Sequence, residues 1–321
     1  MPARSRDIHE RLEWDSAYHS PALVGPVLEL LASSALLLDG TVGGGGHSAA
    51  LLGAGVARVI GIDRDRDALE AATARLADAA AEGRFTAARG NYADLDAIPS
   101  LDGLRFNGIL LDLGLSSHQI DDAARGFSFR EGAPLDMRMG ADATRTAAEL
   151  LDTADEGELA QLFRTYGDEP KAGRLAREVV KRRATRPFAT SDDLVGAIRG
   201  VLGSRSGAPD FARLFQAVRI AVNDEIAGLA RALPALRDRL ASGGVLAVMA
   251  YHSGEDRLVK HAFRDWSAAC ICPPKHPMCT CGGNHSLGEV ITRRAIVAAP
   301  DEVARNPRAR SAKLRAWRRA E

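Results

Sequence analysis

The chain lacks a long apolar segment, dispersed cysteines and an excess of charge of either sign. No run of eighteen apolar residues occurs in its 321 residues, so we expect neither a membrane span nor a membrane partner. The first fifteen residues, MPARSRDIHERLEWD, are too charged for a signal peptide. The four cysteines fall within twelve residues, whereas a secreted disulfide scaffold would spread them more widely. We therefore expect a soluble cytoplasmic protein.

Charge is balanced in total but unevenly placed. The totals of 42 Lys and Arg against 42 Asp and Glu argue by themselves against a nucleic-acid partner. Residues 171–186, however, hold seven basic side chains and one acid, and residues 305–320 hold seven basic side chains and no acid. Such stretches can bind phosphates locally, although each can equally be a solvated helix face.

Short apolar runs and helical patterns alternate along much of the chain. A clear helical pattern covers residues 67–81, and another, residues 224–240, precedes the last strand. Alternating strands and helices predict a parallel sheet covered on both faces, which is an α/β, Rossmann-like fold. The predicted strands are 35–41, 57–63, 84–90, 107–114 and 243–251.

About 130 residues separate the last two predicted strands, which is far more than one crossover helix needs. Most of this segment has a helical pattern, with helix N-cap signals at TADE and TSDD. We therefore expect a helical subdomain inserted into the sheet domain. The expected parts are the first part of the sheet domain, the inserted helical RNA-binding subdomain, and the second part of the sheet domain with a basic C-terminal tail: 1–120, 121–212 and 213–321.

Residues 39–48, DGTVGGGGHS, place four consecutive glycines after the first predicted strand and at the start of a helix. Open α/β sheets bind ligands at the carboxyl ends of their strands, and glycine allows a close approach of the backbone. Asp63 ends the second predicted strand, twenty residues after Gly43. An acid at that distance suits the two hydroxyls of a ribose, so the loop predicts a nucleoside-containing cofactor.

The acid before the glycines distinguishes between two such cofactors. A nicotinamide dinucleotide needs a G-x-G-x-x-G loop for its pyrophosphate, and a carboxylate would repel that group. In this chain the glycine spacing is compressed and Asp39 precedes it. Because a carboxylate attracts an ammonium or a sulfonium, the loop favours S-adenosylmethionine over NAD.

Further polar residues follow the third and fourth predicted strands. Asp112 ends a run of apolar residues in LLDLGLSS, where an acid is not expected to be simple core. Ser116, Ser117 and Gln119 follow in a loop and can form hydrogen bonds with a base or with the methionine part of a cofactor. Tyr92 follows the third strand, where it can cover an adenine or serve as core.

Residues 270–285, CICPPKHPMCTCGGNH, contain two C-x-C pairs separated by six residues, with His276 and His285 nearby. Four thiolates, or thiolates mixed with imidazoles, can bind zinc. C-x-C is less typical of structural zinc than C-x-x-C, so reduced thiols without a metal are the alternative. From the sequence alone we assign no metal. The cysteines are Cys270, Cys272, Cys279 and Cys281.

Taken together, these motifs resemble those of the bacterial small-subunit ribosomal RNA cytosine-N4 methyltransferases, which are S-adenosylmethionine-dependent enzymes. The similar stretches occur in family order over nearly the whole chain, and RGFSF followed by PLDMRM is not a general Rossmann signal. They are DGTVGGGGHS (39–48), GIDRD (61–65), GILLDLGLSSHQID (108–121), RGFSF (125–129), PLDMRM (134–139), FQAVRIAVNDE (215–225), HSGEDRLVK (252–260) and NPRARSAKLR (306–315).

The resemblance implies an enzyme that methylates N4 of a cytidine in the decoding centre of 16S rRNA within the small ribosomal subunit. This chain departs from the family pattern at Tyr92, where most members have Phe. It also departs in three stretches that the resemblance assigns to RNA binding rather than to the cofactor: YHSGEDR, ARLFQAVRI and YGDEP. The residues that it implies as contacts of S-adenosylmethionine are Gly45, Gly46, His47, Asp63, Tyr92, Asp112 and Gln119.

The implied reaction transfers a methyl group to an exocyclic amine whose lone pair is delocalised into the cytosine ring. A pocket assists by accepting the amine hydrogens and by aligning nitrogen, methyl and sulfur. Asp112 is the first candidate acceptor, and the loop of Ser116 and Ser117 is the second. We expect His252 to position groups rather than act as a base. No metal is required, because the electrophile is already cationic.

The target base has to be single-stranded or turned out of a duplex. Lys181, Arg182 and Arg183 of the insert are expected to hold the phosphates. Four side chains can stack on a base or, alternatively, pack a hinge between the domains: Arg125, Phe127, Phe129 and Arg138.

Two other functions stay open at this stage. An NAD-dependent oxidoreductase would share the sheet and would be stabilised by NADH. A non-enzymatic ribosome-assembly factor would share the fold without the chemistry, although the intact acid, glycine loop and DLGLSS argue against it. The sequence leaves the oligomeric state open, with a homodimer as one option.

Overall fold

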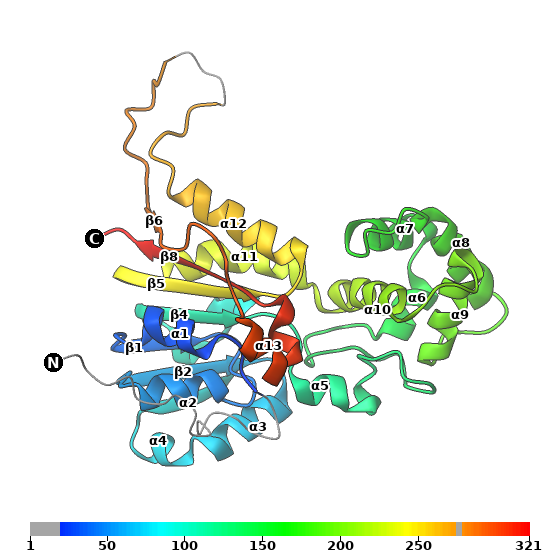
Figure 1. Ribbon diagram of the computed structural model, residues 1–321, viewed down its shortest axis with the longest axis horizontal. Helices are drawn as coiled ribbons and strands as arrows, with labels where there is room; N and C mark the ends of the chain where they lie inside the picture. The colour runs from blue at the N-terminus through cyan, green and yellow to red at the C-terminus, as the bar shows by residue number, and fades with distance from the viewer. Residues whose placement is uncertain (1–19, 274–277) are drawn as a thin grey trace. The chain divides into compact units, whose positions relative to one another are not determined.

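The computed structural model describes residues 20–273 and 278–321, which divide into two units (Figure 1). The sheet unit contains the described residues up to Gly114 together with Leu229–Glu321. The helical unit is Leu115–Gly228. Within the described ranges, no helix is both long and apolar enough to cross a membrane.

A single sheet forms the centre of the sheet unit, with strand order β3-β2-β1-β4-β5-β8-β6 and with β7 paired to β8. The first five strands are parallel, as the alternating pattern predicts, and the last three run antiparallel to their neighbours. The strands are β1 (Leu36–Asp39), β2 (Arg58–Asp63), β3 (Phe85–Arg89), β4 (Phe106–Asp112), β5 (Leu240–Ala250), β6 (Gly288–Val290), β7 (Ile296–Val297) and β8 (Lys313–Arg319).

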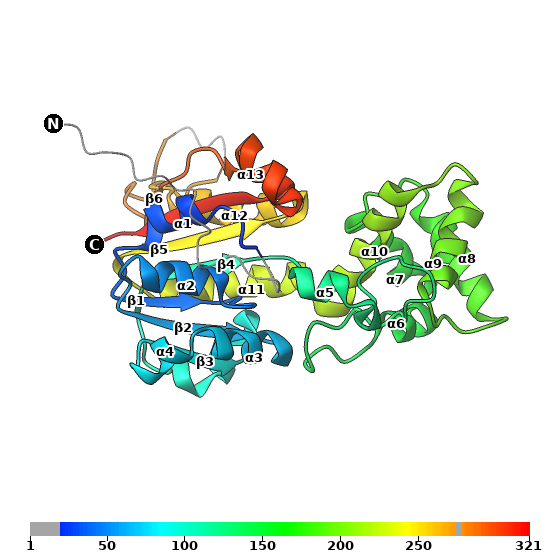
Figure 2. The ribbon, with the colours of Figure 1, turned by 60° about the horizontal axis from the view of Figure 1, so that its bottom comes forward.

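The order of the parallel strands reverses at β1, which pairs with β2 on one side and with β4 on the other (Figure 2). Leu38 is in register with Ile60 and with Ile109. Such a reversal leaves a crevice outside the carboxyl ends of the strands, where ligands of open α/β sheets bind.

Both faces of the sheet are covered, because alternate strand residues enter two different apolar clusters. Leu37 of β1 and Leu110 of β4 belong to the cluster that includes Leu51 of α2. Leu38 and Ile109 belong to the cluster with α11 and α12. The helices of the sheet unit are α1 (Val24–Leu31), α2 (Gly46–Gly53), α3 (Arg66–Arg75), α4 (Ala77–Ala81), α12 (Ser253–Trp266), α13 (Pro300–Arg305), the major part of α11 (Glu225–Asp238), and the 3-10 helices η1 (Tyr92–Ala97), η2 (Pro99–Leu101) and η4 (Pro307–Ser311).

Residues 313–319, which we expected as part of a basic tail, form the interior strand β8 between β5 and β6. Leu314 and Trp317 are fully buried, one on each face of the sheet. The basic side chains of β8 are paired within the unit: Arg315 donates to Asp256 at 2.7 Å, and Arg319 donates to backbone carbonyls. The charge run is therefore a strand whose cations are satisfied locally.

The helical unit packs around its own apolar core, which includes Phe163, Leu175, Leu194 and Phe215. Its helices begin at capping residues, as the sequence indicates: Asp155 caps α7 and Thr190 caps α9. The helices are α5 (Ser117–Asp121), α6 (Ala147–Thr153), α7 (Glu156–Thr165), α8 (Ala172–Arg183), α9 (Ser191–Leu202), α10 (Ala208–Asn223) and the 3-10 helix η3 (Ala123–Arg125).

The expected boundary at residue 212 falls inside α10. Leu214, Phe215 and Val218 of α10 pack in the helical core, so the whole of α10 lies in the helical unit, which extends to Gly228. The other boundary lies at Leu115, a few residues before the expected position.

If β8 is a core strand, Leu314→Ala should lower the free energy of unfolding by about 2–5 kcal/mol, the usual range for truncating a buried leucine. Val297→Ala on β7 is the matched control, because Val297 is 59% exposed, and it should change stability by less than about 0.5 kcal/mol. Urea-induced unfolding measures both. Equal stability of the two variants would contradict the buried position of Leu314.

Candidate functional site

The ends of β1, β2 and β4 bring three acids to one edge of the sheet: Asp39, Asp63 and Asp112. The glycine loop after β1 is tied to both neighbouring strands: its Val42 N–H donates to the Ile62 carbonyl of β2 at 3.0 Å. Its Gly40 N–H donates to the Leu110 carbonyl at 2.9 Å, and the Asp112 N–H donates to the Thr41 hydroxyl at 2.6 Å. The loop and the three acids therefore form one connected structure at the switch point of the sheet.

Asp39 stabilises the loop from within. Its side chain is buried, and one carboxylate oxygen accepts the Ser48 hydroxyl at 2.7 Å while the other accepts the Thr41 N–H at 3.3 Å. Burial raises the pKa of Asp39 above its usual value. We expected this carboxylate to attract a cofactor cation directly. The structure instead directs both of its oxygens to the loop and to the first turns of α2.

Two of the four consecutive glycines are required by the protein's own packing. Gly45 has a positive φ of 76°, and a Cβ there would lie 3.3 Å from Ala72 of α3. A Cβ on Gly46 would lie 3.0 Å from the ring of Pro21. Gly43 differs, because its Cβ would meet only one atom within 4 Å, the Thr41 carbonyl oxygen. The open side of the loop is therefore at Gly43.

Asp63 lies beside that open glycine. It accepts the Gly43 N–H at 3.0 Å with one oxygen and the Asp65 N–H at 2.9 Å with the other. The pKa of Asp63 is raised to about 6, chiefly by burial and to a smaller extent by the nearby carboxylates of Asp65 and Asp39, although these two hydrogen bonds lower it. Each oxygen keeps a lone pair that can accept a hydroxyl, as a ribose contact requires.

Asp112 has two polar neighbours in the sheet unit. The Tyr251 hydroxyl donates to Asp112 Oδ1 at 2.8 Å, and His47 Nδ1 lies 3.5 Å from Asp112 Oδ2. The His47 Nε2–H donates to the Ala22 carbonyl at 2.9 Å, which fixes the ring. Burial, and the charge of Asp112, raise the pKa of Tyr251 well above its usual value, so its hydroxyl remains a donor.

Tyr251 is a site residue that sequence reasoning missed. It lies just beyond β5, and β5 pairs with β4 so that Met249 is in register with Asp112. The signal was the aromatic residue that ends GGVLAVMAY, but only the strand order shows that this residue adjoins Asp112.

Two further candidates of the sheet unit have defined positions. Tyr92 begins η1 directly after β3, and a Cβ on Gly40 would lie 3.6 Å from the Tyr92 Cβ, so Tyr92 lies beside the loop. The partly buried Tyr92 also packs against the apolar cluster that contains Leu229 and Leu233 of α11. His252 is the N-cap of α12, and its Nε2 lies 3.2 Å from Glu255 Oε1. His252 thus has a capping role in addition to any role at the site.

The remaining candidates belong to the helical unit. Ser116 and Gln119 form the capping box of α5: the Ser116 N–H donates to Gln119 Oε1, and the Gln119 N–H donates to Ser116 Oγ. Ser117 is the first residue of α5. The reciprocal hydrogen bonds of Ser116 and Gln119 explain why α5 starts here.

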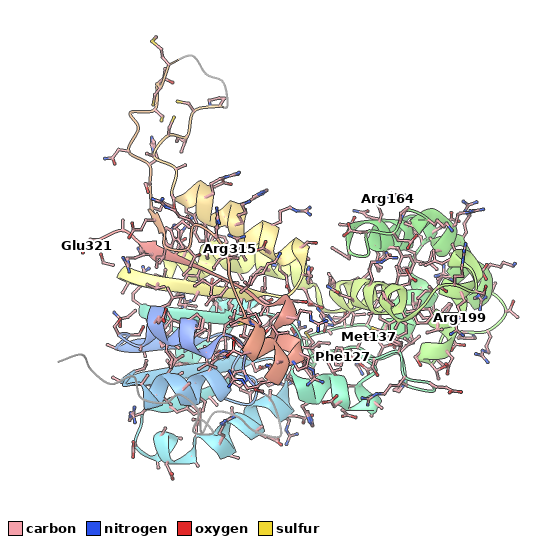
Figure 3. The ribbon with its side chains drawn as sticks, in the orientation of Figure 1. Phe127, Met137, Arg164, Arg199, Arg315 and Glu321 are labelled. Atoms are coloured by element: carbon pink, nitrogen blue, oxygen red, sulfur yellow. The ribbon has the colours of Figure 1, made fainter. Side chains whose placement is uncertain are left out.

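The candidate stacking residues pack within the helical unit. The Arg125 guanidinium donates to the carbonyls of Arg138 and Met139 and lies 5.8 Å from the centre of the Phe127 ring. Phe127 packs against the same apolar core that contains Met137, and both are labelled in Figure 3. Phe129 is 37% exposed and makes edge contacts with the rings of Phe211 and Phe215: of the four, it has the aromatic surface most available to a base.

The cations of the basic stretch 171–186, among them the expected phosphate-binding residues Lys181, Arg182 and Arg183, fall into two groups. Arg182 pairs with Glu178 at 2.7 Å, and Arg183 donates to the carbonyls of Leu151 and Ala154, so both have structural partners. A second group is exposed and has no ion-pair partner among the described residues, and its spacing places it along one side of α8. Its members are Lys171, Arg174 and Lys181.

A parallel sheet with a reversal at β1, a glycine loop at that point and an acid at the end of the next strand define a nucleoside-cofactor enzyme of the Rossmann-like α/β class. The profile of the MraW methylase family matches residues 16–320. The chain belongs to this family, and the resemblance inferred from its motifs is confirmed.

Curated relatives are similar over almost their whole length. The chain is 62% identical to ribosomal RNA small subunit methyltransferase H of Gemmatimonas aurantiaca, over 94% of this chain and 96% of the relative. It is 47% identical to the protein of the same name from Heliobacterium modesticaldum, over 93% and 97%. A solved rRNA methylase from Streptococcus thermophilus has 11% identity and a TM-score of 0.41, over 93% of this chain and 94% of that chain.

Proposed function

We propose that the protein is an S-adenosylmethionine-dependent methyltransferase that modifies N4 of a cytidine in 16S rRNA of the small ribosomal subunit. Membership of the MraW methylase family and the names of the curated relatives support the reaction and the rRNA substrate. The structural observation that carries the proposal is the arrangement of two acids on either side of β1. Asp63 lies beside the open Gly43 at the end of β2, and Asp112 ends β4.

The residues present fit the cofactor. Asp63 has lone pairs for the two ribose hydroxyls, and Gly43 leaves room for a ligand against the backbone. Tyr92, beside Gly40, is proposed to cover the adenine. Gly45, Gly46 and His47 are proposed to contact the cofactor through the loop that Asp39 stabilises, and Gln119 through α5.

Bound S-adenosylmethionine supplies a methyl group on a cationic sulfur, so the chain's own task is to prepare the nucleophile. We propose that Asp112 accepts a hydrogen of the cytosine amine, which shifts the nitrogen lone pair out of the ring, and takes the proton that the amine loses on methylation. The Tyr251 hydroxyl holds the carboxylate in place, and His47 lies beside it. Alignment of the reactants contributes about 7–11 kcal/mol in favourable cases.

Ser116 and Ser117 remain the second candidate acceptors, and His252 a positioning residue. On the RNA side, the target cytidine is proposed to lie in the decoding centre and to be turned out of its helix. Phe129 offers it a stacking surface, and the exposed cations of α8 hold the backbone. We propose that the reaction takes place in the cytoplasm. The enzyme is proposed to be either a monomer or a homodimer, and light scattering distinguishes these two states.

Mass mapping of 16S rRNA from cells with and without the protein tests the function. One cytidine should lose a single methyl group in its absence, and the purified protein with S-adenosylmethionine should restore it. Thermal stabilisation by NADH, and not by S-adenosylmethionine, would favour the oxidoreductase instead. Unchanged rRNA methylation together with altered subunit assembly would favour the non-enzymatic factor.

Affinity for S-adenosylmethionine should fall as the pH decreases through about 6, because burial raises the pKa of Asp63 to that value and the ribose hydroxyls donate to its ionised form. At higher pH, Asp63→Asn should weaken binding by about 1–3 kcal/mol, and it should remove this pH dependence. Calorimetry measures both. Asp102→Asn, on an exposed turn, is the matched control. Wild-type affinity in a folded Asp63→Asn protein would refute the ribose contact.

Asp112→Asn should slow methyl transfer by about 100-fold or more, which is the scale of losing a proton acceptor, while cofactor affinity changes much less. Asparagine keeps the size and one acceptor oxygen but cannot take up a proton. Single-turnover rates at saturating S-adenosylmethionine separate the chemical step from binding. A wild-type rate under those conditions would show that Asp112 has no chemical role.

Arg174→Gln combined with Lys181→Gln should weaken RNA binding and reduce the slope of log affinity against log salt by roughly 1–2, because fewer counterions are released. The affinity for S-adenosylmethionine and the methylated position should not change, since phosphates carry no base identity. Arg58→Gln with Arg105→Gln, two exposed cations at the amino ends of strands, is the control pair. Equal salt slopes for the two pairs would exclude α8 as the phosphate-binding surface.

A further inference from the structure

An arm of the sheet unit, residues 267–288, leaves the end of α12 and returns to β6, standing away from the sheet (Figure 1). None of its described residues is buried. A segment of this length without secondary structure or apolar core cannot be ordered by burial of side chains. Whatever orders the arm has to lie within it.

Two backbone hydrogen bonds align the limbs of the arm at its base. The Leu287 N–H donates to the Trp266 carbonyl at 2.8 Å, and the His285 N–H donates to the Ala269 carbonyl at 3.0 Å. The two limbs are therefore antiparallel at the base of the arm. The two C-x-C pairs follow next, one on each limb, and therefore face each other.

The four cysteine sulfurs form one cluster. All lie within 4.8 Å of one another. The Sγ atoms of Cys270, Cys279 and Cys281 form a triangle with sides of 3.6, 3.6 and 3.7 Å. Four thiolates about 2.3 Å from a central zinc lie about 3.8 Å apart, so the triangle has nearly the size of one face of that tetrahedron.

The backbone around the cluster suits thiolates. The Thr280 N–H donates to Cys272 Sγ at 3.3 Å, a contact that favours negative charge on the sulfur. Gly282 and Gly283 follow Cys281 with φ values of 83° and 68°, which turn the chain sharply behind the sulfur. Larger residues rarely adopt these angles, so the GG pair is part of the cluster's construction.

We propose that Cys270, Cys272, Cys279 and Cys281 bind one zinc ion as four thiolates, with release of their four thiol protons to solvent. This departs from the sequence analysis, which assigned no metal. The geometry also decides between an all-sulfur and a mixed site for the residues it describes. The clustered ligand atoms come from the four cysteines alone, and His285 stands outside the cluster, with its Nε2 donating to the Cys281 carbonyl at 2.7 Å. His276 lies outside the described residues.

The zinc acts as a structural staple. It joins the two limbs beyond the base of the arm, where none of the described side chains is buried, and the ligand cluster contains no carboxylate. All four positions are filled by protein sulfur, which is the mark of a structural rather than a catalytic site. The site presents the exposed side chains of Ile271 and Met278 on a fixed scaffold.

The test is the zinc content of the untagged full-length chain, measured by plasma mass spectrometry after mild chelation. We expect about one zinc per chain. Cys279→Ser with Cys281→Ser should lose the metal, whereas His285→Ala, the matched control, should keep it. Cobalt substitution of the wild type should give the ligand-field bands of a tetrahedral site and a thiolate charge-transfer band.

Because the arm lies outside the core, the double serine variant should retain the unfolding transition of the sheet unit and the affinity for S-adenosylmethionine. These two readouts separate loss of the site from loss of the fold. Zinc well below one per chain, zinc retained in the double variant, or zinc lost from His285→Ala would each overturn the proposal. So would native-state mass spectrometry showing two disulfides.

Discussion

The buried carboxylate of Asp39 is the interaction on which the site depends. An acid in this position is costly unless its oxygens are satisfied, and Ser48 of α2 and Thr41 of the loop supply the donors. Thr41 in turn accepts the Asp112 N–H, so β1, α2 and β4 are held by one short chain of hydrogen bonds. The loop backbone is thereby placed before any ligand arrives.

This arrangement gives the three acids of the sheet edge different tasks through their surroundings. Asp39 is closed off and structural. Asp63 holds the Gly43 amide on the open side of the loop, and burial raises its pKa. Asp112 accepts the Tyr251 hydroxyl at the end of β4, with the His47 ring beside its other oxygen. With the roles proposed for Asp63 and Asp112, three residues of one type would serve packing, binding and chemistry.

The sequence predicted the parallel strands, because buried strands read as continuous apolar runs, and it placed Asp63 and Asp112 at the strand ends where the structure has them. It did not reveal β8, since the basic residues of LRAWRR mask the two-residue alternation of Leu314 and Ala316. Nor did it reveal Tyr251 as the partner of Asp112, because that contact follows from strand order. The sequence also showed the basic run of α8, but it could not separate paired from unpaired cations, because the partners of Arg182 and Arg183 are set by the fold.

The insertion of the helical unit between β4 and β5 has a consequence for how the chain folds. Asp112 and Met249 are neighbours in the sheet but lie 137 residues apart in sequence, so their pairing raises the contact order of the whole protein. The helical unit has its own core and mostly local contacts, and it can form first. Once the helical unit has formed, the connection between β4 and β5 is a compact folded unit and no longer a long flexible loop. Less conformational entropy is then lost when β5 pairs with β4. The inserted helices therefore have a part in assembling the sheet as well as in extending its surface.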